Sequence, residues 1–265
     1  MREFEFLAEL ERRGLIVGVE HDAAQIEGLV VTQDALVEGV HFRFDLVDWH
    51  ELGYRAAAVN VSDLAASGAE PLALVVTLSA PDLEGAVALY EGIAEVGVPV
   101  RGGDTTRGDR VVVGVTAIGR ADRVPGRAGA RPGDLLVVTG PLGTAGAAFR
   151  EGRLVRPPLR VAEGRRLAAV AHAMLDISDG LGPDAAHIAE RSGCRLAIDL
   201  DRVPLAPGAT RSDLEFGEDY ELLAATPDAL GFTVVGRCEE GSGVNLELGG
   251  WEHFVQPPLH VRSRA

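Results

Sequence analysis

The sequence contains no lysine, so each of its basic side chains is an arginine or a histidine. This absence excludes a P-loop with its Gly-Lys-Ser/Thr motif, the lysine of protein kinases, and any mechanism through a Schiff base. A phosphate bound by this chain would therefore have to be held by metal ions, arginine side chains or backbone N–H groups.

Positive charge is scarce in general, because 25 arginines face 40 carboxylates and leave a formal net charge of −15 with histidine neutral. Proteins that bind nucleic acids carry a basic face, so we expect no nucleic-acid partner. An acidic protein that handles phosphates would need additional cations, and metal ions are the obvious source.

Long apolar runs are also missing, since no stretch reaches the ~18 residues that a membrane-spanning helix requires. The first residues are acidic and amphipathic, unlike a signal peptide, and a cytoplasmic protein with no membrane partner is expected. The two cysteines, Cys194 and Cys238, lack the spacing of metal ligands and are predicted to be buried, reduced thiols. A length of 265 residues allows one large domain or two smaller ones.

The segment from Met174 to Asp184 is the most informative part of the chain. Asp176, Ser178 and Asp179 precede Gly180, and a helix is expected over residues 185–192. Two carboxylates and a hydroxyl thus stand where an extended segment turns into a helix, a place that suits anions and metal-bound phosphates. An ordinary helix cap followed by a glycine turn is the alternative.

Four further carboxylates stand in similar settings, beside apolar runs and among small or hydroxyl residues: Asp22, Asp34, Asp63 and Asp104. Carboxylates that are placed alike along a chain can converge on hard cations such as Mg²⁺. Gly103 and its neighbour Gly102 would let the backbone before Asp104 approach a phosphate closely, although Gly-Gly-Asp is also a common turn.

Hydrophobic periodicity predicts alternating helices and strands on both sides of a Gly/Pro/Arg-rich linker at 123–133. Within this linker, Arg127 could bind a phosphate or remain solvated. His41 could be a ligand or a loop residue, and Tyr90 and Trp251 could be core residues or ligand contacts. Helices are expected at 3–13, 48–67, 81–97, 159–173 and 185–192, and strands at 28–32, 71–79, 98–101, 110–119, 134–139, 195–200 and 232–238.

Several motifs in order along the chain resemble those of the thiamine-monophosphate kinase family, in the superfamily of aminoimidazole ribonucleotide synthetase. The resemblance extends from about Asp22 to Phe254. The motifs are Asp34 with Glu38–Phe42, Asn60–Leu64, Gly102–Asp104, Gly126–Arg127, Asp176–Leu181, Gly217–Leu223 and Gly250–Phe254.

The resemblance implies a two-domain α/β (α+β) fold in which the sheet of the N-terminal domain pairs across a homodimer. Residues 1–125 would form an N-terminal ATP/Mg-binding and dimerisation domain, and residues 126–265 a C-terminal α/β domain. The implied reaction is the ATP-dependent phosphorylation of thiamine monophosphate to thiamine diphosphate by direct transfer, assisted by several Mg²⁺ ions and without a protein nucleophile.

The resemblance also implies roles for individual residues. Contacts to ATP would come from Tyr90, Gly103, Asp104, Arg127 and Ser178. Contacts to thiamine monophosphate would come from His41, Glu218 and Trp251. Ligands to Mg²⁺ would be Asp22, Thr32, Gln33, Asp34, Asp63, Asp104, Asp176 and Asp179.

The chain departs from the family pattern near its N-terminus. His21 replaces one carboxylate of a Gly-Asp-Asp motif, and Gln33 replaces the usual hydroxyl residue before Asp34. These changes motivate an alternative, a catalytically altered member that binds nucleotide or thiamine phosphate without turnover. A related ATP-dependent synthetase is a further alternative, which Glu218 and the Trp251 motif argue against.

Overall fold

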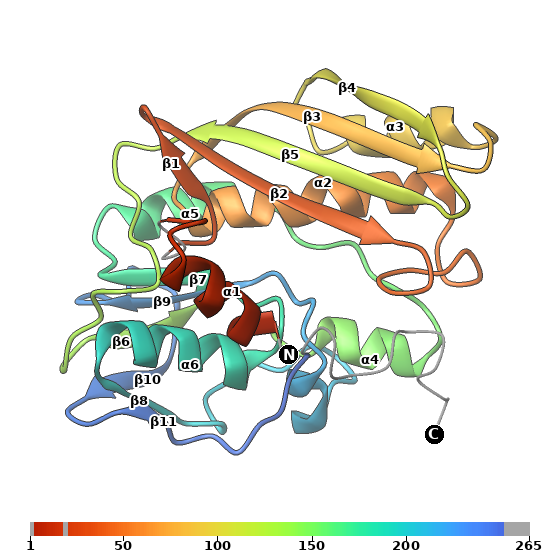
Figure 1. Cartoon of the computed structure of the whole chain (residues 1–265). Coiled ribbons are helices and arrows are strands. Elements are labelled where there is room, and N and C mark those ends of the chain that lie inside the picture. Colours follow the sequence, from red (N-terminus) through yellow and green to blue (C-terminus); the bar gives the residue numbers. More distant parts are fainter. Residues whose placement is uncertain (1–2, 18–20, 252–265) are drawn as a thin grey trace.

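The computed structural model describes residues 3–17 and 21–251, which form two β-sheets separated by a layer of helices (Figure 1). Helices α2 (Trp49–Ala66), α3 (Ala86–Ala94) and α5 (Val161–Ala168) lie in the layer between the sheets, and α6 (Leu181–Ser192) covers the other face of the second sheet. Two sheets with their own helices agree with the predicted α/β fold class.

The first sheet has five strands in the order β1 (Ala24–Ile26), β2 (Leu29–Val37), β5 (Val112–Arg120), β3 (Glu70–Ala80) and β4 (Val100–Arg107). Neighbouring strands are antiparallel except β3 and β4, which are parallel. Along β5, Val113, Val115 and Ala117 are buried and the residues between them are partly exposed, so one face of the strand packs on the core.

Helix α2 is the central element of the molecule. It begins after Asp48, whose side chain accepts a hydrogen bond from the N–H of Glu51 at 2.8 Å and so caps the helix. Its small residues permit close packing, because a Cβ at Gly53 would lie 1.9 Å from the carbonyl oxygen of Leu89 in α3. In the same way, Gly164 of α5 leaves no room for a Cβ beside the carbonyl of Ala65. The run of alanines and glycines thus lets both neighbouring helices approach α2.

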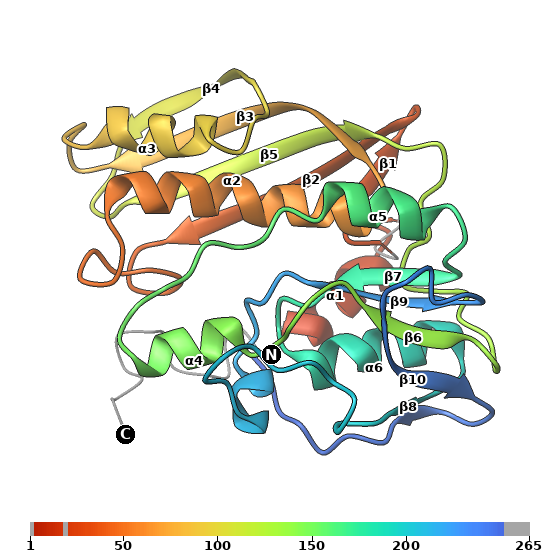
Figure 2. The same ribbon diagram turned by 180° about the vertical axis from the view of Figure 1, so that it is seen from behind.

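The second sheet has six strands in the order β11, β8, β10, β6, β9 and β7, seen from both sides in Figures 1 and 2. Ala185 and Ile188 of α6 pack on one face, and Leu167 of α5 with Ala65 of α2 contributes to the core on the other. The strands are β6 (Leu135–Val138), β7 (Ala173–Asp176), β8 (Arg195–Ile198), β9 (Leu222–Thr226), β10 (Thr233–Glu239) and β11 (Gly243–Val244). The remaining helices are α1 (Glu3–Arg12), α4 (Thr144–Arg150) and a 3-10 helix at Arg211–Glu215.

Several predicted boundaries are wrong, each because tertiary pairing overrides the local pattern. The predicted strand at 28–32 continues to Val37 along β5, so Asp34 lies within β2 and not after it. The strand predicted at 98–101 continues through Gly102–Asp104 to Arg107 as β4, where Gly103 pairs with Val76 and a Cβ on it would lie 1.8 Å from the Val76 carbonyl oxygen.

Helix boundaries shift for related reasons. The predicted helix 159–173 ends at Ala168, because Ala173 already pairs with β9 as the first residue of β7. The helix predicted from residue 185 begins at Leu181, immediately after Gly180. The helix predicted over 81–97 spans only Ala86–Ala94.

Both cysteines are free and buried in the second core, as the sequence predicts. In the part of the chain that the structure describes, we find no helix with the length and apolarity needed to cross a membrane.

Candidate functional site

A cavity of about 370 Å³ lies where β2 and α2 of the first half meet β7 and α6 of the second half. Trp251 and the segment from Phe216 to Tyr220 close it on another side. Most of the residues that the sequence singles out line this cavity. They are Asp22, Thr32, Gln33, Asp34, His41, Asp63, Arg127, Asp176, Ser178, Asp179, Glu218 and Trp251.

Two of the carboxylates are fixed by short hydrogen bonds from hydroxyl groups. The Thr32 hydroxyl of β2 donates to Asp63 Oδ2 of α2 at 2.5 Å. The Ser62 hydroxyl, one residue earlier on α2, donates to Asp176 Oδ2 at the end of β7 at 2.5 Å. Helix α2 therefore connects the strand of one sheet to the strand of the other through acidic groups at the cavity.

Burial and the charges of neighbouring carboxylates raise the pKa values of two of the acidic groups. Burial, followed by the charges of Asp34, Asp176 and Asp22, raises the pKa of Asp63 well above its ordinary value. Burial and the charge of Asp22 raise the pKa of Asp176 to about 7. A cluster of this kind either holds protons or is neutralised by cations.

Arg127 is the cation that accompanies this cluster in the structure. Its Nε donates to Asp22 Oδ1 at 2.7 Å, and its Nη2 lies 2.6 Å from the same oxygen. Burial raises the pKa of Asp22, and the charge of Arg127 opposes that shift. The neighbouring His21 does not line the cavity. Its Nδ1 packs against Gly126, and a Cβ added to Gly126 would lie 1.9 Å from that nitrogen.

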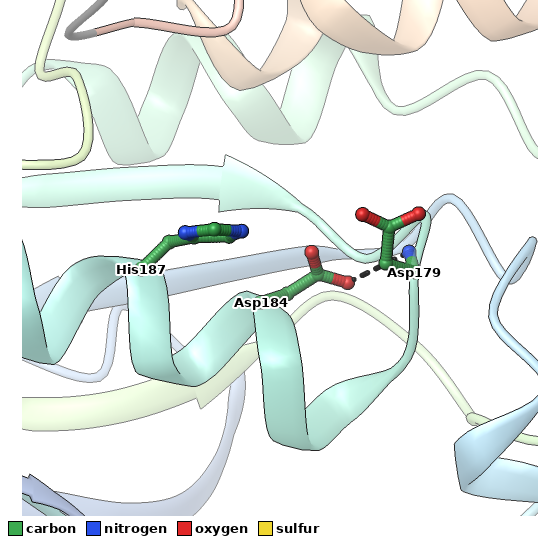
Figure 3. Close-up of side chains that lie close together, drawn as sticks. All are labelled: Asp179, Asp184 and His187. Carbon is green, nitrogen blue, oxygen red and sulfur yellow. Dashed lines mark hydrogen bonds between the residues drawn. The ribbon is translucent and has the colours of Figure 1, made fainter. Parts of the chain in front are cut away.

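A second group of possible ligands lies at the start of α6 (Figure 3). One ligand atom each from Asp179, Asp184 and His187 lies within 4.8 Å of the others. Asp184 Oδ2 accepts the backbone N–H groups of Asp179 and Gly180, each at 3.0 Å, and so fixes the turn. Burial, then the charge of Asp179, raises the pKa of Asp184 well above its ordinary value, and burial lowers the pKa of His187 to about 4.

The sequence reasoning missed Asp184 and His187, although a signal was present. The two residues stand three apart, which places them on one face of a helix. The helix expected over residues 185–192 excludes Asp184, whereas the observed α6 begins at Leu181 and includes it.

The wall around Glu218 has unusual backbone geometry. Glu218 and Tyr220 both have positive φ, 60° and 52°, a region that non-glycine residues rarely adopt. The strain is held by backbone hydrogen bonds, from Glu218 N–H to the Ser178 carbonyl at 2.7 Å and from Tyr220 N–H to the Ile177 carbonyl at 2.9 Å. Strained segments of this type cluster at ligand sites.

The other two predicted substrate contacts are also held by the backbone. Trp251 N–H donates to the Asp179 carbonyl at 2.8 Å, which places the tryptophan beside the β7–α6 turn. His41 Nδ1 accepts the N–H of Val37 at 3.0 Å, so its Nδ1 carries no proton in this contact.

Three predicted ATP contacts, Tyr90, Gly103 and Asp104, do not line the cavity of this chain. Asp34 pairs with Val115, which pairs with Val76, which pairs with Gly103. At about 4.8 Å per strand spacing, Gly103 lies about 14 Å from Asp34 across the sheet. Asp104 therefore cannot share an ion with Asp34 of the same chain, and its role at ATP stays a prediction.

The donor set of the cavity fits a hard divalent cation. Its groups are mainly carboxylate and hydroxyl oxygens, which Mg²⁺ prefers, and among the described residues no cysteine lines it. The raised pKa values of Asp63 and Asp176, caused first by burial and then by neighbouring carboxylates, also fit, because a bound cation would favour the ionised form of both groups.

Comparisons with known proteins agree with this arrangement. The family models for the N-terminal and C-terminal domains of AIR synthase related proteins match residues 20–121 and 131–240. A thiamine-monophosphate kinase of Escherichia coli K12 is 33% identical, with 91% of this chain and 93% of that protein covered. One from Mycobacterium tuberculosis is 36% identical, with 92% and 87% covered.

Solved structures give the same result. The structure of AaThiL complexed with AMPPCP and TMP matches with a TM-score of 0.86 and 29% identity, covering 96% of this chain and 97% of that one. Thiamine monophosphate kinase from Aquifex aeolicus matches with a TM-score of 0.82 and 31% identity, over 95% and 100% of the two chains. The chain therefore belongs to the AIR synthase related family, within the group that contains the thiamine-monophosphate kinases.

Proposed function

We propose that this chain transfers the γ-phosphoryl group of ATP to the phosphate of thiamine monophosphate, giving thiamine diphosphate and ADP. The observation that carries the proposal is the acidic cavity between the two sheets, in a chain similar to AaThiL, which was solved with AMPPCP and TMP. Two anionic substrates would be repelled by this lining unless cations accompany them. The cavity is thus suited to phosphates that arrive with metal ions.

Mg²⁺ is the cation that the oxygen-rich lining favours. Bound Mg²⁺ would neutralise the phosphate oxygens and polarise the transferred group. The proposed ligands are Asp22, Thr32, Gln33, Asp34, Asp63, Asp176 and Asp179 of one chain, together with Asp104 of a second copy. The hydroxyls of Thr32 and Ser62 orient Asp63 and Asp176, so two of these carboxylates are held in place before any ion binds.

The nucleotide would be held by Arg127 and Ser178 within the cavity. Arg127 contributes a planar guanidinium that suits phosphate oxygens, and Ser178 lies in the turn before the N-terminus of α6, where the helix dipole favours anions. Arg127 pairs with Asp22, so a nucleotide and its metal ions would compete for both partners.

We further propose a homodimer in which Tyr90, Gly103 and Asp104 serve the nucleotide site of the second copy. These residues lie away from the cavity of their own chain, and every residue of β4 is exposed at the edge of its sheet. An exposed edge strand without lysine or proline offers its backbone groups for pairing. We also propose that the two domains meet between residues 125 and 126. A cytoplasmic location is proposed as well.

Thiamine monophosphate would contact His41, Glu218 and Trp251 on the opposite wall. The indole of Trp251 suits stacking on the rings of the acceptor, and the carboxylate of Glu218 suits its cationic thiazolium or amino group. No protein nucleophile is required, because the acceptor phosphate itself attacks and the chain supplies orientation and charge neutralisation.

The proposal is tested by ADP release from ATP and Mg²⁺, with and without thiamine monophosphate. We expect release that depends on thiamine monophosphate, and its near-complete loss in Asp63→Ala and Asp179→Ala. Asp201→Ala is the matched control, because the Asp201 side chain is 84% exposed and does not line the cavity. Nucleotide binding without acceptor-dependent release would instead favour a binding protein without turnover.

A further inference from the structure

A buried arginine on α2 stands behind the wall of the cavity that holds Glu218. Arg55 is 2% exposed, and its Nη2 lies 2.6 Å from Glu218 Oε1 in an ion pair. Its Nη1 donates to the Val155 carbonyl at 3.0 Å, and its guanidinium carbon lies 6.0 Å from the centre of the Tyr220 ring. One side chain thus contacts two residues of the strained segment and the loop that leads from α4 to α5.

The position of Arg55 on α2 relates it directly to the acidic cluster. Arg55, Val59 and Asp63 follow one another at intervals of four, so they share one side of the helix. Val59 and Asp63 line the cavity. With a rise of 1.5 Å per residue, Arg55 and Asp63 lie about 12 Å apart along the axis. Helix α2 therefore places a carboxylate at the proposed metal end and a guanidinium at the proposed acceptor end.

The shortest contact of the ion pair is between Arg55 Nη2 and Glu218 Oε1. Glu218 lines the cavity with a side chain that is 21% exposed, so its carboxylate is reachable from the cavity although Oε1 contacts a buried arginine. Arg55 Nε has no hydrogen-bond partner in the described part of the chain. The burial of Arg55 therefore depends on Glu218 for its neutralisation, and the two side chains restrict each other.

Resting on the proposed function, we propose that Arg55 is a positioning residue of the acceptor site. It holds Glu218 through Oε1 and leaves Oε2 to accept the N–H groups or balance the positive charge of the bound acceptor. Because Arg55 belongs to α2 and Glu218 to the segment before β9, the contact also fixes the acceptor wall relative to the metal-binding helix. This contact would keep the acceptor phosphate aligned with the γ-phosphate of the nucleotide.

The test is a double-mutant cycle on Arg55→Met and Glu218→Gln, read as KM and kcat for each substrate. We expect Arg55→Met to raise the KM for thiamine monophosphate at least tenfold, with the KM for ATP changed less than twofold. The double variant should be no worse than Glu218→Gln, because Arg55 acts through Glu218. Arg55→Lys keeps the positive charge on a side chain of different length, so its KM for thiamine monophosphate should lie between those of the unmodified protein and Arg55→Met.

A control is provided by a second, partly buried ion pair, in which Arg160 is 24% and Glu221 5% exposed. Arg160 donates to both oxygens of Glu221, at 2.7 and 2.6 Å, three residues beyond Glu218, and neither residue lines the cavity. Arg160→Met should lower the thermal midpoint while leaving the KM for thiamine monophosphate within twofold. An equal rise of that KM in Arg160→Met would mean general loosening of the segment and would overturn the positioning role.

The remaining outcomes also decide the matter. The inference is wrong if Arg55→Met is folded and has an unchanged KM for thiamine monophosphate. It is also wrong if the rise of this KM in the double variant equals the product of the rises in the two single variants. If Arg55→Met does not fold, the double variant, which leaves no buried unpaired charge, and Arg55→Lys carry the same comparison. Absence of acceptor-dependent turnover in the unmodified protein would remove the proposed function itself, and the inference with it.

Discussion

The affinity for Mg²⁺ should depend on pH through Asp176. The ordinary pKa of this carboxyl is 3.8, and burial with the charge of Asp22 raises it to about 7. A shift of about three units corresponds to about 4 kcal/mol of differential stabilisation between the protonated and ionised forms. The metal-free protein gains this contribution fully below pH 3.8 and loses it as pH rises through about 7, because the folded state binds the proton more tightly than the unfolded state.

A bound cation reverses the direction of this pH dependence, because Mg²⁺ requires the ionised carboxylate and so stabilises the folded protein more at high pH. With a pKa of about 7, about nine tenths of Asp176 is ionised at pH 8 and about one tenth at pH 6. Proton competition at this group alone should therefore weaken Mg²⁺ binding about tenfold between pH 8 and pH 6, which is about 1.4 kcal/mol. For a chain of this size that difference is worth about 3–5 °C in the thermal midpoint at saturating Mg²⁺.

The assay is thermal unfolding with Mg²⁺ titrated at pH 6, 7 and 8. We expect a larger Mg²⁺-induced rise of the midpoint at pH 8 than at pH 6. Asp176→Asn should flatten the dependence, and the exposed Asp201→Asn should preserve it. An equal Mg²⁺ effect at both pH values, or a dependence that survives in Asp176→Asn, would refute the reasoning.

Three further expectations follow from single contacts. Ser62→Ala removes the hydrogen bond that lowers the pKa of Asp176, so we expect weaker Mg²⁺ binding at pH 7, by severalfold in calorimetry, with unchanged binding as the contrary result. Gly164→Ala places a Cβ 2.1 Å from a carbonyl oxygen of α2 and should cost about 1–3 kcal/mol in urea unfolding, whereas Gly102→Ala meets no atom within 4 Å and serves as the control. Burial raises the pKa of Asp219 to about 6, so the folded protein loses stability through this group as pH rises from about 4 to 6. Asp219→Asn should reduce that loss, measured as the free energy of unfolding against pH. An unchanged profile would mean that Asp219 does not cause the loss of stability.

Strands β2, β3 and β5 of the first sheet could be predicted because their sequences are rich in valine and leucine, whereas the short strand β1 (Ala24–Ile26) falls in a segment expected to be a loop. What local pattern could not give was where each strand stops, since β2 extends to Val37 through its pairing with β5. Gly102 and Gly103 are typical of a turn in isolation, and only the neighbouring strand β3 makes them part of a strand. Likewise, Ala173 has high helix propensity but pairs with Ala225 of β9.

The candidate site shows the same division between local and distant information. The carboxylates of the motifs could be found in the sequence, and most of them line one cavity. Arg55 carries no local signal, because its partner Glu218 is distant in sequence and reaches it only through the packing of α2 against the second half. The positions of Tyr90, Gly103 and Asp104 outside the cavity could not be anticipated either, because strand order is set by pairing and not by sequence order.

The central claim is direct phosphoryl transfer between two phosphates, and the most direct measurement follows the label. The protein would be incubated with ATP labelled at the γ-phosphorus, Mg²⁺ and thiamine monophosphate, and the products separated. We expect the label in thiamine diphosphate, in a one-to-one ratio with ADP, and no transfer when Mg²⁺ is chelated. Label that appears only as inorganic phosphate, or remains in ATP while thiamine monophosphate binds, would contradict the account.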